Sequence, residues 1–297
     1  MSHTATGPVA DDYVWSSWRR GFWLYWQHPL IHAGRYLGFM TRRFIPGRVV
    51  QFTDGTGNRF VSMKNNFTAM AVAVLGERDP DVMRFLRSWL RPGGVALDVG
   101  ANIGTYAIPL ARLVGARGRV IAFEPNRPTR ACLRHNVRLN QLNNILVVSS
   151  AVGAVSGQQG LVVTAGNAGE VHLAPRDADH GRTDVRVTTL DEEMSRLGIP
   201  AVDYIKLDIE GYELAALRGA TRILRESPRL VIQTEIVLAH LQRYGFTLED
   251  LVGFFAGLGY RPYECSAEGI MRAVDPQAEH RESDWFWARS PDIFARS

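Results

Sequence analysis

Two short apolar runs with an acidic residue at or near their ends lie in the first half of the chain. The first covers residues 95–99 and contains Asp98, and the second covers residues 120–123 and is followed by Glu124. Such runs are typical of strands that are buried on both faces of a parallel sheet. Similar runs follow at residues 145–148, 203–209 and 230–235. Because helical stretches separate the runs, the pattern predicts an α/β fold with a mostly parallel sheet.

Apolar residues at helical spacing predict the helices of this fold. Asp79 and Pro80 are expected to begin the first of them, as an acidic cap followed by proline in the first turn. The sequence from Thr247 to Asp250 predicts a capping box for the last one. Other helices are expected over residues 104–113, 128–139 and 212–224. Two more strands are expected at residues 260–265 and 285–288.

The first 76 residues show a different pattern. Four aromatic residues lie at helical spacing near the start, namely Trp15, Trp18, Phe22 and Trp26. Pro29 separates them from a second helical piece, and residues 49–63 alternate around a glycine-rich turn, which predicts a hairpin. We therefore expect an extension over residues 1–76 and the α/β domain over residues 77–297.

The aromatic stripe has three interpretations. It can dock on the core or on a second subunit, which would make the protein a homo-oligomer. Alternatively, the tryptophans can lie at a membrane surface, with Arg19, Arg20, Arg42 and Arg43 facing anionic lipid. The third alternative is a lid over a ligand pocket of the α/β domain.

The loop after the first strand indicates the ligand. It reads DxGxNxG, from Asp98 through Gly100 and Asn102 to Gly104, whereas a dinucleotide site shows GxGxxG. Asp98 would repel a pyrophosphate, but it can pair with the amino group or sulfonium of S-adenosylmethionine. The loop therefore predicts S-adenosylmethionine as the cofactor.

Further cofactor contacts are expected at the ends of neighbouring strands, where ligands of such sheets bind. Glu124 is expected to accept hydrogen bonds from the ribose hydroxyls, and Ser150 with the backbone near Ala151 to bond the adenine. The predicted cofactor-binding residues are Asp98, Gly100, Asn102, Gly104, Glu124, Asn126, Ser150, Ala151 and Asp208.

Methyl transfer to an alcohol requires a base near the sulfur. Asp208 is the first choice, and Glu235 and His240 are the alternatives. His172 and His180, in an insertion at residues 157–187, are further base candidates, although a solvated loop histidine is the simpler interpretation of each.

The residues around Asp208 allow further expectations. Asp208 and Glu210 are two residues apart and should point to the same side, although Glu210 can instead cap the helix that follows. Lys206 lies inside an apolar strand and needs a partner, which we expect to be Asp98 or Glu235. No metal is assumed; if Mg²⁺ binds, its ligands are expected to be Asp208, Glu210 and Glu235.

Composition adds three restrictions. The net charge of +4 with no long basic run does not favour a nucleic-acid partner. The two cysteines form no disulfide framework or zinc spacing, and no secretion signal or long apolar run is found, so we expect a cytoplasmic protein. A nicotinamide-dependent oxidoreductase is disfavoured, because the glycine pattern differs and only two lysines are present; a non-catalytic nucleotide-binding regulator stays open.

Six sequence blocks in order resemble the FkbM family of S-adenosylmethionine-dependent methyltransferases. They read VALDVGANIG, VIAFEPN, SAVG, VTTLDE, DYIKLDIEGYE and VIQTE, and the resemblance covers about residues 77–260. It implies a Rossmann-like, class I methyltransferase fold with a seven-stranded sheet whose last strand is antiparallel. It also implies O-methylation of a small-molecule or glycoside acceptor, with the hydroxyl on a sugar, a glycolipid or a polyketide-like natural product.

Overall fold

The structure is a computed structural model of the 297-residue chain. It describes residues 29–44, 47–164, 167, 170–174, 183–278 and 283–294. The aromatic stripe from Trp15 to Trp26 and the base candidate His180 lie outside these residues. Within them, no helix combines the length and the apolar character needed to cross a membrane.

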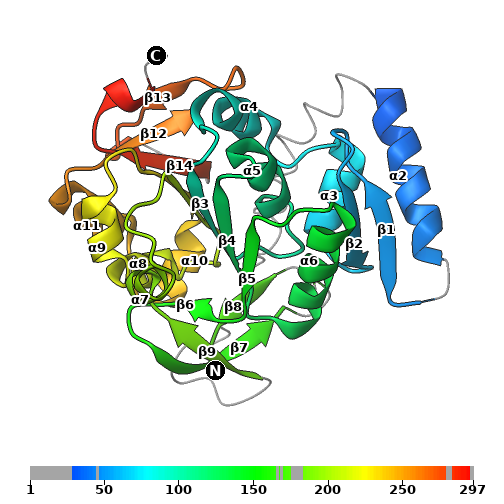
Figure 1. The fold of residues 1–297 in the computed structure, drawn as a ribbon, viewed down its shortest axis with the longest axis horizontal. Coiled ribbons are helices and arrows are strands. Elements are labelled where there is room, and N and C mark those ends of the chain that lie inside the picture. Colours follow the sequence, from blue (N-terminus) through cyan, green and yellow to red (C-terminus); the bar gives the residue numbers. More distant parts are fainter. Residues whose placement is uncertain are drawn as a thin grey trace, which may run out of the picture.

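A mostly parallel sheet forms the centre of the molecule (Figure 1). Over the described residues its strand order is β13-β12-β14-β11-β10-β3-β4-β5. The parallel strands are β3 (Val95–Val99), β4 (Arg119–Phe123), β5 (Ile145–Val148), β10 (Tyr204–Leu207) and β11 (Val231–Ile236). Strand β14 (Ser283–Ala288) runs antiparallel to its neighbours β11 and β12 (Arg261–Cys265). The predicted α/β fold with an antiparallel last strand is confirmed.

One edge of the sheet carries a strand that the sequence did not predict. Strand β13 (Met271–Ala273) forms a hairpin with β12, so this sheet has eight strands in the described part of the chain instead of seven. Its residues are half-buried or exposed. A polar edge strand has no apolar run to mark it in the sequence.

Helices cover both faces of the sheet, and alternate strand residues point to each face. Leu97, Ile205 and Trp285 pack on one face, beneath α7 (Leu190–Arg196), α8 (Glu213–Arg218), α9 (Thr221–Glu226) and α11 (Leu248–Gly257). Ala96 and Tyr204 pack on the other, beneath α4 (Pro80–Trp89), α5 (Ala107–Val114) and α6 (Arg127–Leu139). Helix α10 (Leu238–Arg243) follows β11, and a short 3₁₀ helix, η1 (Pro291–Phe294), follows β14.

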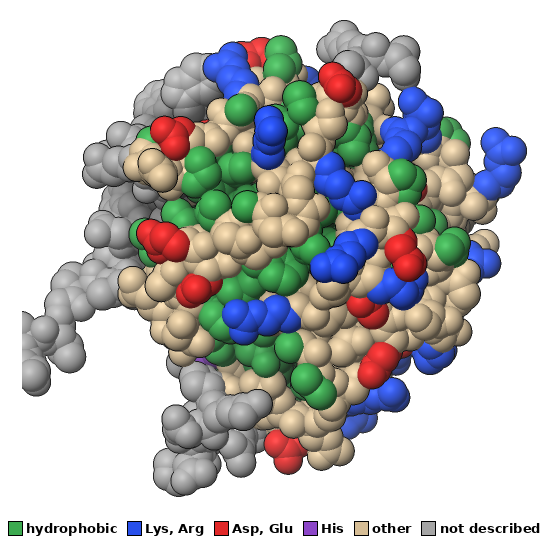
Figure 2. Space-filling model, turned by 90° about the vertical axis from the view of Figure 1, so that its left-hand side faces the viewer, with side chains coloured by type: hydrophobic (Ala, Val, Ile, Leu, Met, Phe, Trp, Pro, Cys, Tyr) green, Lys and Arg blue, Asp and Glu red, His purple; other side chains and the backbone are tan. Residues whose placement is uncertain are grey.

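Figure 2 shows the face of the molecule that lies on the left in Figure 1, near α11 and β12. Hydrophobic side chains form a band across it, with basic and acidic side chains around them. Helix α11 contributes partly buried residues that pack on the core, including Leu248, Val252 and Phe254. The capping box predicted for this helix is confirmed, since Thr247 and Asp250 bond each other's backbone N–H groups.

The N-terminal segment packs beside α6 (Figure 1). It comprises α2 (Pro29–Phe44), the predicted hairpin of β1 (Val49–Thr53) and β2 (Arg59–Met63), and α3 (Phe67–Leu75). Asn136 of α6 accepts a hydrogen bond from the Val61 backbone N–H (2.7 Å) and donates one to the Val61 carbonyl (3.0 Å). The side chain of Asn136 therefore makes the two hydrogen bonds that a neighbouring strand would make with Val61 of β2.

A smaller sheet lies near the carboxyl end of the central strands. Its order is β6-β9-β7-β8, and its strands are β6 (Ala151–Val152), β7 (Gly157–Val163), β8 (Val171–Leu173) and β9 (Thr183–Thr188). The hairpin-like segments predicted in the insertion correspond to β7 and β8, which pair antiparallel.

The helix predicted over residues 212–224 is two helices, α8 and α9. Gly219 lies between them, and a Cβ atom at this position would lie 2.2 Å from the carbonyl oxygen of Gly153. The chain bends where it passes close to the backbone of another segment, and helical periodicity does not reveal such a contact.

Candidate active site

The loop between β3 and α5 forms one wall of the candidate site. The backbone N–H groups of Gly100 and Ala101 both donate to the carbonyl oxygen of Phe123, at 3.1 and 2.9 Å, which fixes the loop to the end of β4. Gly100 has a φ of 84°, and a Cβ atom there would lie 2.0 Å from the carbonyl oxygen of Asp208. Glycine is therefore required, and the loop lies directly against the end of β10.

A small hollow lies between this loop and β10. Its lining residues are Thr68, Arg78, Asp98, Gly100, Ala101, Asn102, Thr105, Tyr106, Lys206 and Asp208, and we call it the donor hollow. Four predicted cofactor residues, Asp98, Gly100, Asn102 and Asp208, line it. The other five, Gly104, Glu124, Asn126, Ser150 and Ala151, are not among its lining residues. Because ligands of open α/β sheets bind at the carboxyl ends of the strands, the donor hollow is the candidate cofactor site.

Asp98 lies beneath the donor hollow and is 1% exposed. Neither of its carboxylate oxygens accepts a hydrogen bond of ordinary geometry among the described residues. Burial raises the pKa of Asp98 to about 6, against the opposing effect of Lys206. A buried carboxylate that lies next to a hollow and accepts no hydrogen bond of ordinary geometry fits a cationic ligand such as the amino or sulfonium group of S-adenosylmethionine.

Lys206 supplies the positive charge beneath the hollow. Its Nζ donates to Asp208 Oδ2 at 2.7 Å and lies 4.7 Å from the centre of the Tyr106 ring. We expected the partner to be Asp98 or Glu235. Asp98 is the neighbour of Lys206 across the strand pair and favours its charged form, but the hydrogen bond goes to Asp208. Burial alone would raise the pKa of Asp208; Lys206 and Arg78 outweigh this effect and hold the pKa below its usual value.

Three residues near Lys206 were missed by sequence reasoning. Arg78 lies 3.7 Å from Asp208 Oδ2 and donates to Asp79 at 3.1 Å, and the Tyr106 hydroxyl also donates to Asp79, at 2.7 Å. Asp79 was expected to cap α4, but its side chain makes no capping bond because it is used here. Arg78 lies in a polar connection without periodicity, so no pattern marks it. Tyr106 follows the loop motif by two residues, and this proximity is the one available signal.

Glu124 directly follows β4 and holds two loops together. One carboxylate oxygen accepts the backbone N–H of Asn102 at 2.9 Å, and the other accepts that of Asn126 at 2.8 Å. Burial raises the pKa of Glu124 to about 8, although both N–H groups lower it. Each oxygen keeps a position for a further hydrogen bond, so the carboxyl group can also bind ribose hydroxyls. Beyond it, Ser150 is buried and Ala151 begins β6; their contacts with the adenine stay a prediction.

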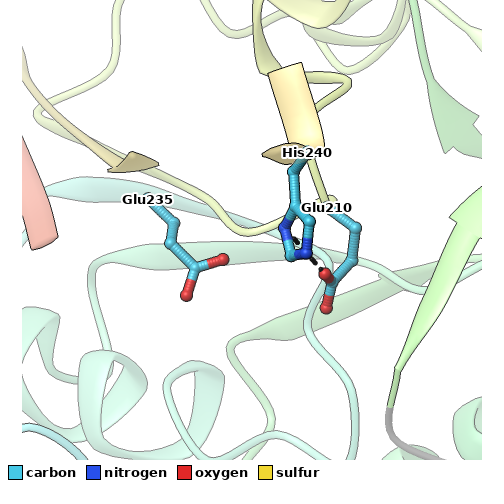
Figure 3. Close-up of side chains that lie close together, drawn as sticks. All are labelled: Glu210, Glu235 and His240. Carbon is cyan, nitrogen blue, oxygen red and sulfur yellow. Dashed lines mark ion pairs between the residues drawn. The ribbon is translucent and has the colours of Figure 1, made fainter. Parts of the chain in front are cut away.

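A second group of ionisable side chains lies at the same end of the sheet. We call Glu210, Glu235 and His240 the Glu–Glu–His cluster (Figure 3). One ligand atom from each residue lies within 4.8 Å of the others. His240 Nδ1 is 3.2 Å from Glu210 Oε2.

The cluster does not include Asp208, which we expected to accompany Glu210 and Glu235. Strand β10 ends at Leu207, and Glu210 has a φ of 58°, so the two-residue alternation of a strand does not extend to it. The side chain of Glu210 points to His240. The alternative role of Glu210 as a helix cap is not found, since the start of α8 makes no side-chain capping bond. Instead, the carboxylate of Glu213 accepts the backbone N–H groups of Ile209 and Gly211 in the turn before the helix.

His172, the other described base candidate, lies in β8 and is partly buried. Burial lowers the pKa of His172, and Arg243 adds to this effect, so a neutral imidazole is favoured there. Its position on β8 places it in the smaller sheet, outside the donor hollow.

The strand order, the glycine loop after β3 and the acidic residues at the ends of β3 and β4 define a class I methyltransferase, the class whose methyl donor is S-adenosylmethionine. The sequence also matches the profile of the methyltransferase FkbM domain over residues 98–262, more than half of the chain. The chain belongs to the FkbM methyltransferase family, which confirms the resemblance.

Two curated proteins are similar to this chain. The hexuronic acid methyltransferase AglP of Haloferax volcanii is 27% identical over 158 residues, which cover 52% of this chain and 62% of AglP. The AMB antimetabolite synthetase AmbE of Pseudomonas aeruginosa is 24% identical over 193 residues, covering 53% of this chain and 9% of AmbE. The chain therefore spans less than two thirds of the length of either relative.

Solved structures of methyltransferases are also similar. An O-methyltransferase from Bacillus cereus, solved with S-adenosylhomocysteine, has a TM-score of 0.42 and 14% identity, covering 71% of this chain and 81% of that chain. An S-adenosylmethionine-dependent O-methyltransferase from Thermotoga maritima has a TM-score of 0.41 and 15% identity, covering 82% and 77%.

Proposed function

We propose that the protein transfers a methyl group from S-adenosylmethionine to a hydroxyl of a sugar acceptor, with uronic acid glycosides as the first class to test. The observation that carries the proposal is the pairing of two carboxylates in one hollow. Asp98 is buried and accepts no hydrogen bond of ordinary geometry, while Asp208 is held ionised by Lys206 and Arg78. The similarity to a hexuronic acid methyltransferase supports a sugar acceptor.

The residues of the donor hollow have different roles in the proposed reaction. Asp98 holds the positively charged part of the donor, and the loop at Gly100 provides close backbone contact. When bound, the donor supplies its methyl group: a C–O bond forms at the acceptor hydroxyl, the C–S bond breaks, and its electron pair stays on sulfur. The hydroxyl proton passes to a carboxylate oxygen of Asp208.

Lys206 fixes the position of that carboxylate. Lys206 is 4% exposed, and its ammonium group donates a hydrogen bond to Asp208 Oδ2. The other carboxylate oxygen of Asp208 is therefore the one that can face a hydroxyl. A carboxylate with a lowered pKa is a weak proton acceptor. Proton transfer therefore has to occur as the C–O bond forms, when the hydroxyl becomes strongly acidic.

The test uses S-adenosylmethionine with an isotopically labelled methyl group. The protein is incubated with a glucuronic acid glycoside, the matched glucoside and a simple alcohol, and products are identified by mass spectrometry and NMR. The proposal predicts one labelled methyl ether on a glycoside hydroxyl, with the uronic acid glycoside favoured. A methyl group found only on nitrogen or carbon acceptors would contradict it.

A further inference from the structure

The Glu–Glu–His cluster is built from three separate elements. Glu210 lies in the turn after β10, Glu235 lies near the end of β11, and His240 lies in α10. Figure 3 shows the three side chains converging, with Glu235 approaching from its strand toward the pair formed by the other two. Since their ligand atoms lie within 4.8 Å of one another, a single ion can contact all three.

The backbone is adapted to bring Glu210 to His240. Gly211 has a φ of 97°, and a Cβ atom there would lie 2.2 Å from the carbonyl oxygen of His240. The turn that carries Glu210 thus packs directly on α10, which only glycine allows. The Arg243 side chain also donates to the Glu210 carbonyl, at 3.3 Å.

The cluster places two carboxylates and one imidazole in a largely buried position. Glu210 Oε2 and His240 Nδ1 have almost no exposed surface and lie 3.2 Å apart, and Glu210 Oε2 accepts no hydrogen bond of ordinary geometry from the described residues. Glu235 brings a second carboxylate to the same group of atoms. Two like charges held this close repel each other, and a cation bound between them would offset the repulsion.

We propose that Glu210, Glu235 and His240 bind one divalent cation. Two carboxylate oxygens and one imidazole nitrogen suit a first-row ion such as Mn²⁺, because Mg²⁺ and Ca²⁺ prefer ligand sets made only of oxygen. Three protein ligands leave coordination positions open. Adjacent hydroxyls of a sugar can occupy them.

The catalytic part of this inference depends on the proposed function. A hydroxyl bound to the cation has a lower pKa, so a weak base such as Asp208 can take its proton. The cation therefore compensates for the low basicity of Asp208, which is paired with Lys206. His240 acts as a ligand in this scheme and not as the base.

The experiment measures Mn²⁺ binding alone, by electron paramagnetic resonance of the free ion, on chelator-treated protein. We expect one saturable site per chain. Glu235→Gln and His240→Gln should each weaken binding by about tenfold or more, since even the loss of a supporting contact to a ligand costs ten- to a hundredfold. Glu249→Gln makes the same chemical change as Glu235→Gln on the exposed surface of α11 and should bind as the wild type does.

Two further measurements complete the test. Retained binding of S-adenosylhomocysteine shows that the Gln variants are folded. No saturable Mn²⁺ binding by the wild type, or unchanged binding by both cluster variants, would overturn the site.

The two proposals can fail separately. Full methyl transfer after exhaustive chelation would overturn the role of the cation and leave the proposed function intact. Mn²⁺ binding without methyl transfer to any hydroxyl would overturn the proposed function and leave the site intact.

Discussion

The donor hollow and the Glu–Glu–His cluster lie at the same end of the sheet, but they differ in whether their buried carboxylates have a cationic partner. In the hollow, Asp208 has Lys206 at 2.7 Å and Arg78 at 3.7 Å, so its negative charge is stable without a ligand. In the cluster, burial and Glu235 raise the pKa of Glu210, and no cation lies among the described residues that form it. The first region is ready to orient a hydroxyl, whereas the second is complete only with a cation.

The largest expected effect is that of Asp208→Asn. An amide can still accept a hydrogen bond from Lys206, but it cannot take the hydroxyl proton. Turnover should fall by about 10²–10⁴-fold, while S-adenosylhomocysteine binds with little change. Steady-state kinetics and calorimetry measure the two quantities, and full turnover would dismiss Asp208 as the base.

Lys206→Met tests the balance of charge in the donor hollow. The variant leaves Asp98 and Asp208 buried without their nearest cation, and breaking a buried pair in this way costs about 3–5 kcal/mol of unfolding free energy. Glu210→Gln removes a carboxyl group whose pKa is raised by burial and by Glu235, so its loss should cost less than the loss of Lys206. Urea unfolding of both variants compares them, and equal losses would show that the two regions do not differ.

The pH dependence of stability is a third test. The pKa of Glu124 is raised in the folded protein from 4.5 to about 8. The protonated form is therefore favoured by folding, and its contribution to stability is complete below pH 4.5 and is lost as pH rises through about 8. Without ligand, the unfolding free energy should fall by a few kcal/mol across this range.

The matched variant for this test is Glu124→Gln, which cannot ionise. Its unfolding free energy should change less with pH than that of the wild type. Because the amide nitrogen cannot accept one of the two backbone N–H groups, the variant should also be less stable at low pH. Identical pH profiles would contradict the assignment of the titration to Glu124.

The smallest expected effect lies outside both regions. Thr247→Ala removes the side chain that caps α11 and should cost about 1 kcal/mol of unfolding free energy. Neither S-adenosylhomocysteine nor Mn²⁺ binding should change. A loss of ligand binding in this variant would mean that effects on stability and on the site cannot be separated by variants of this kind.

The same contrast separates what the sequence could predict from what it could not. The glycine loop, the strand at residues 145–148 and the capping box at Thr247 are local patterns, and each is found as expected. Strand boundaries near the site were less well predicted, because the turn at Glu210 follows an apolar run that continues past the end of β10.

Contacts between distant segments were beyond the reach of sequence patterns. Arg78 meets Asp208 across 130 positions of sequence, and His240 meets Glu210 because two segments of backbone approach at Gly211. The sequence predicted that Asp208, Glu210 and Glu235 form one group. In the structure Asp208 is bonded to Lys206, and His240 lies with the two glutamates. The positions of ionisable residues in the sequence show no periodicity from which these pairings could be predicted.

Calorimetric titration with S-adenosylhomocysteine tests the central claim most directly. We expect one molecule to bind per chain, NAD not to bind, and Glu124→Ala to weaken the affinity by about ten- to a hundredfold through the loss of the hydrogen bonds to the ribose hydroxyls. Binding of NAD, or no heat with S-adenosylhomocysteine at any concentration, would contradict the account.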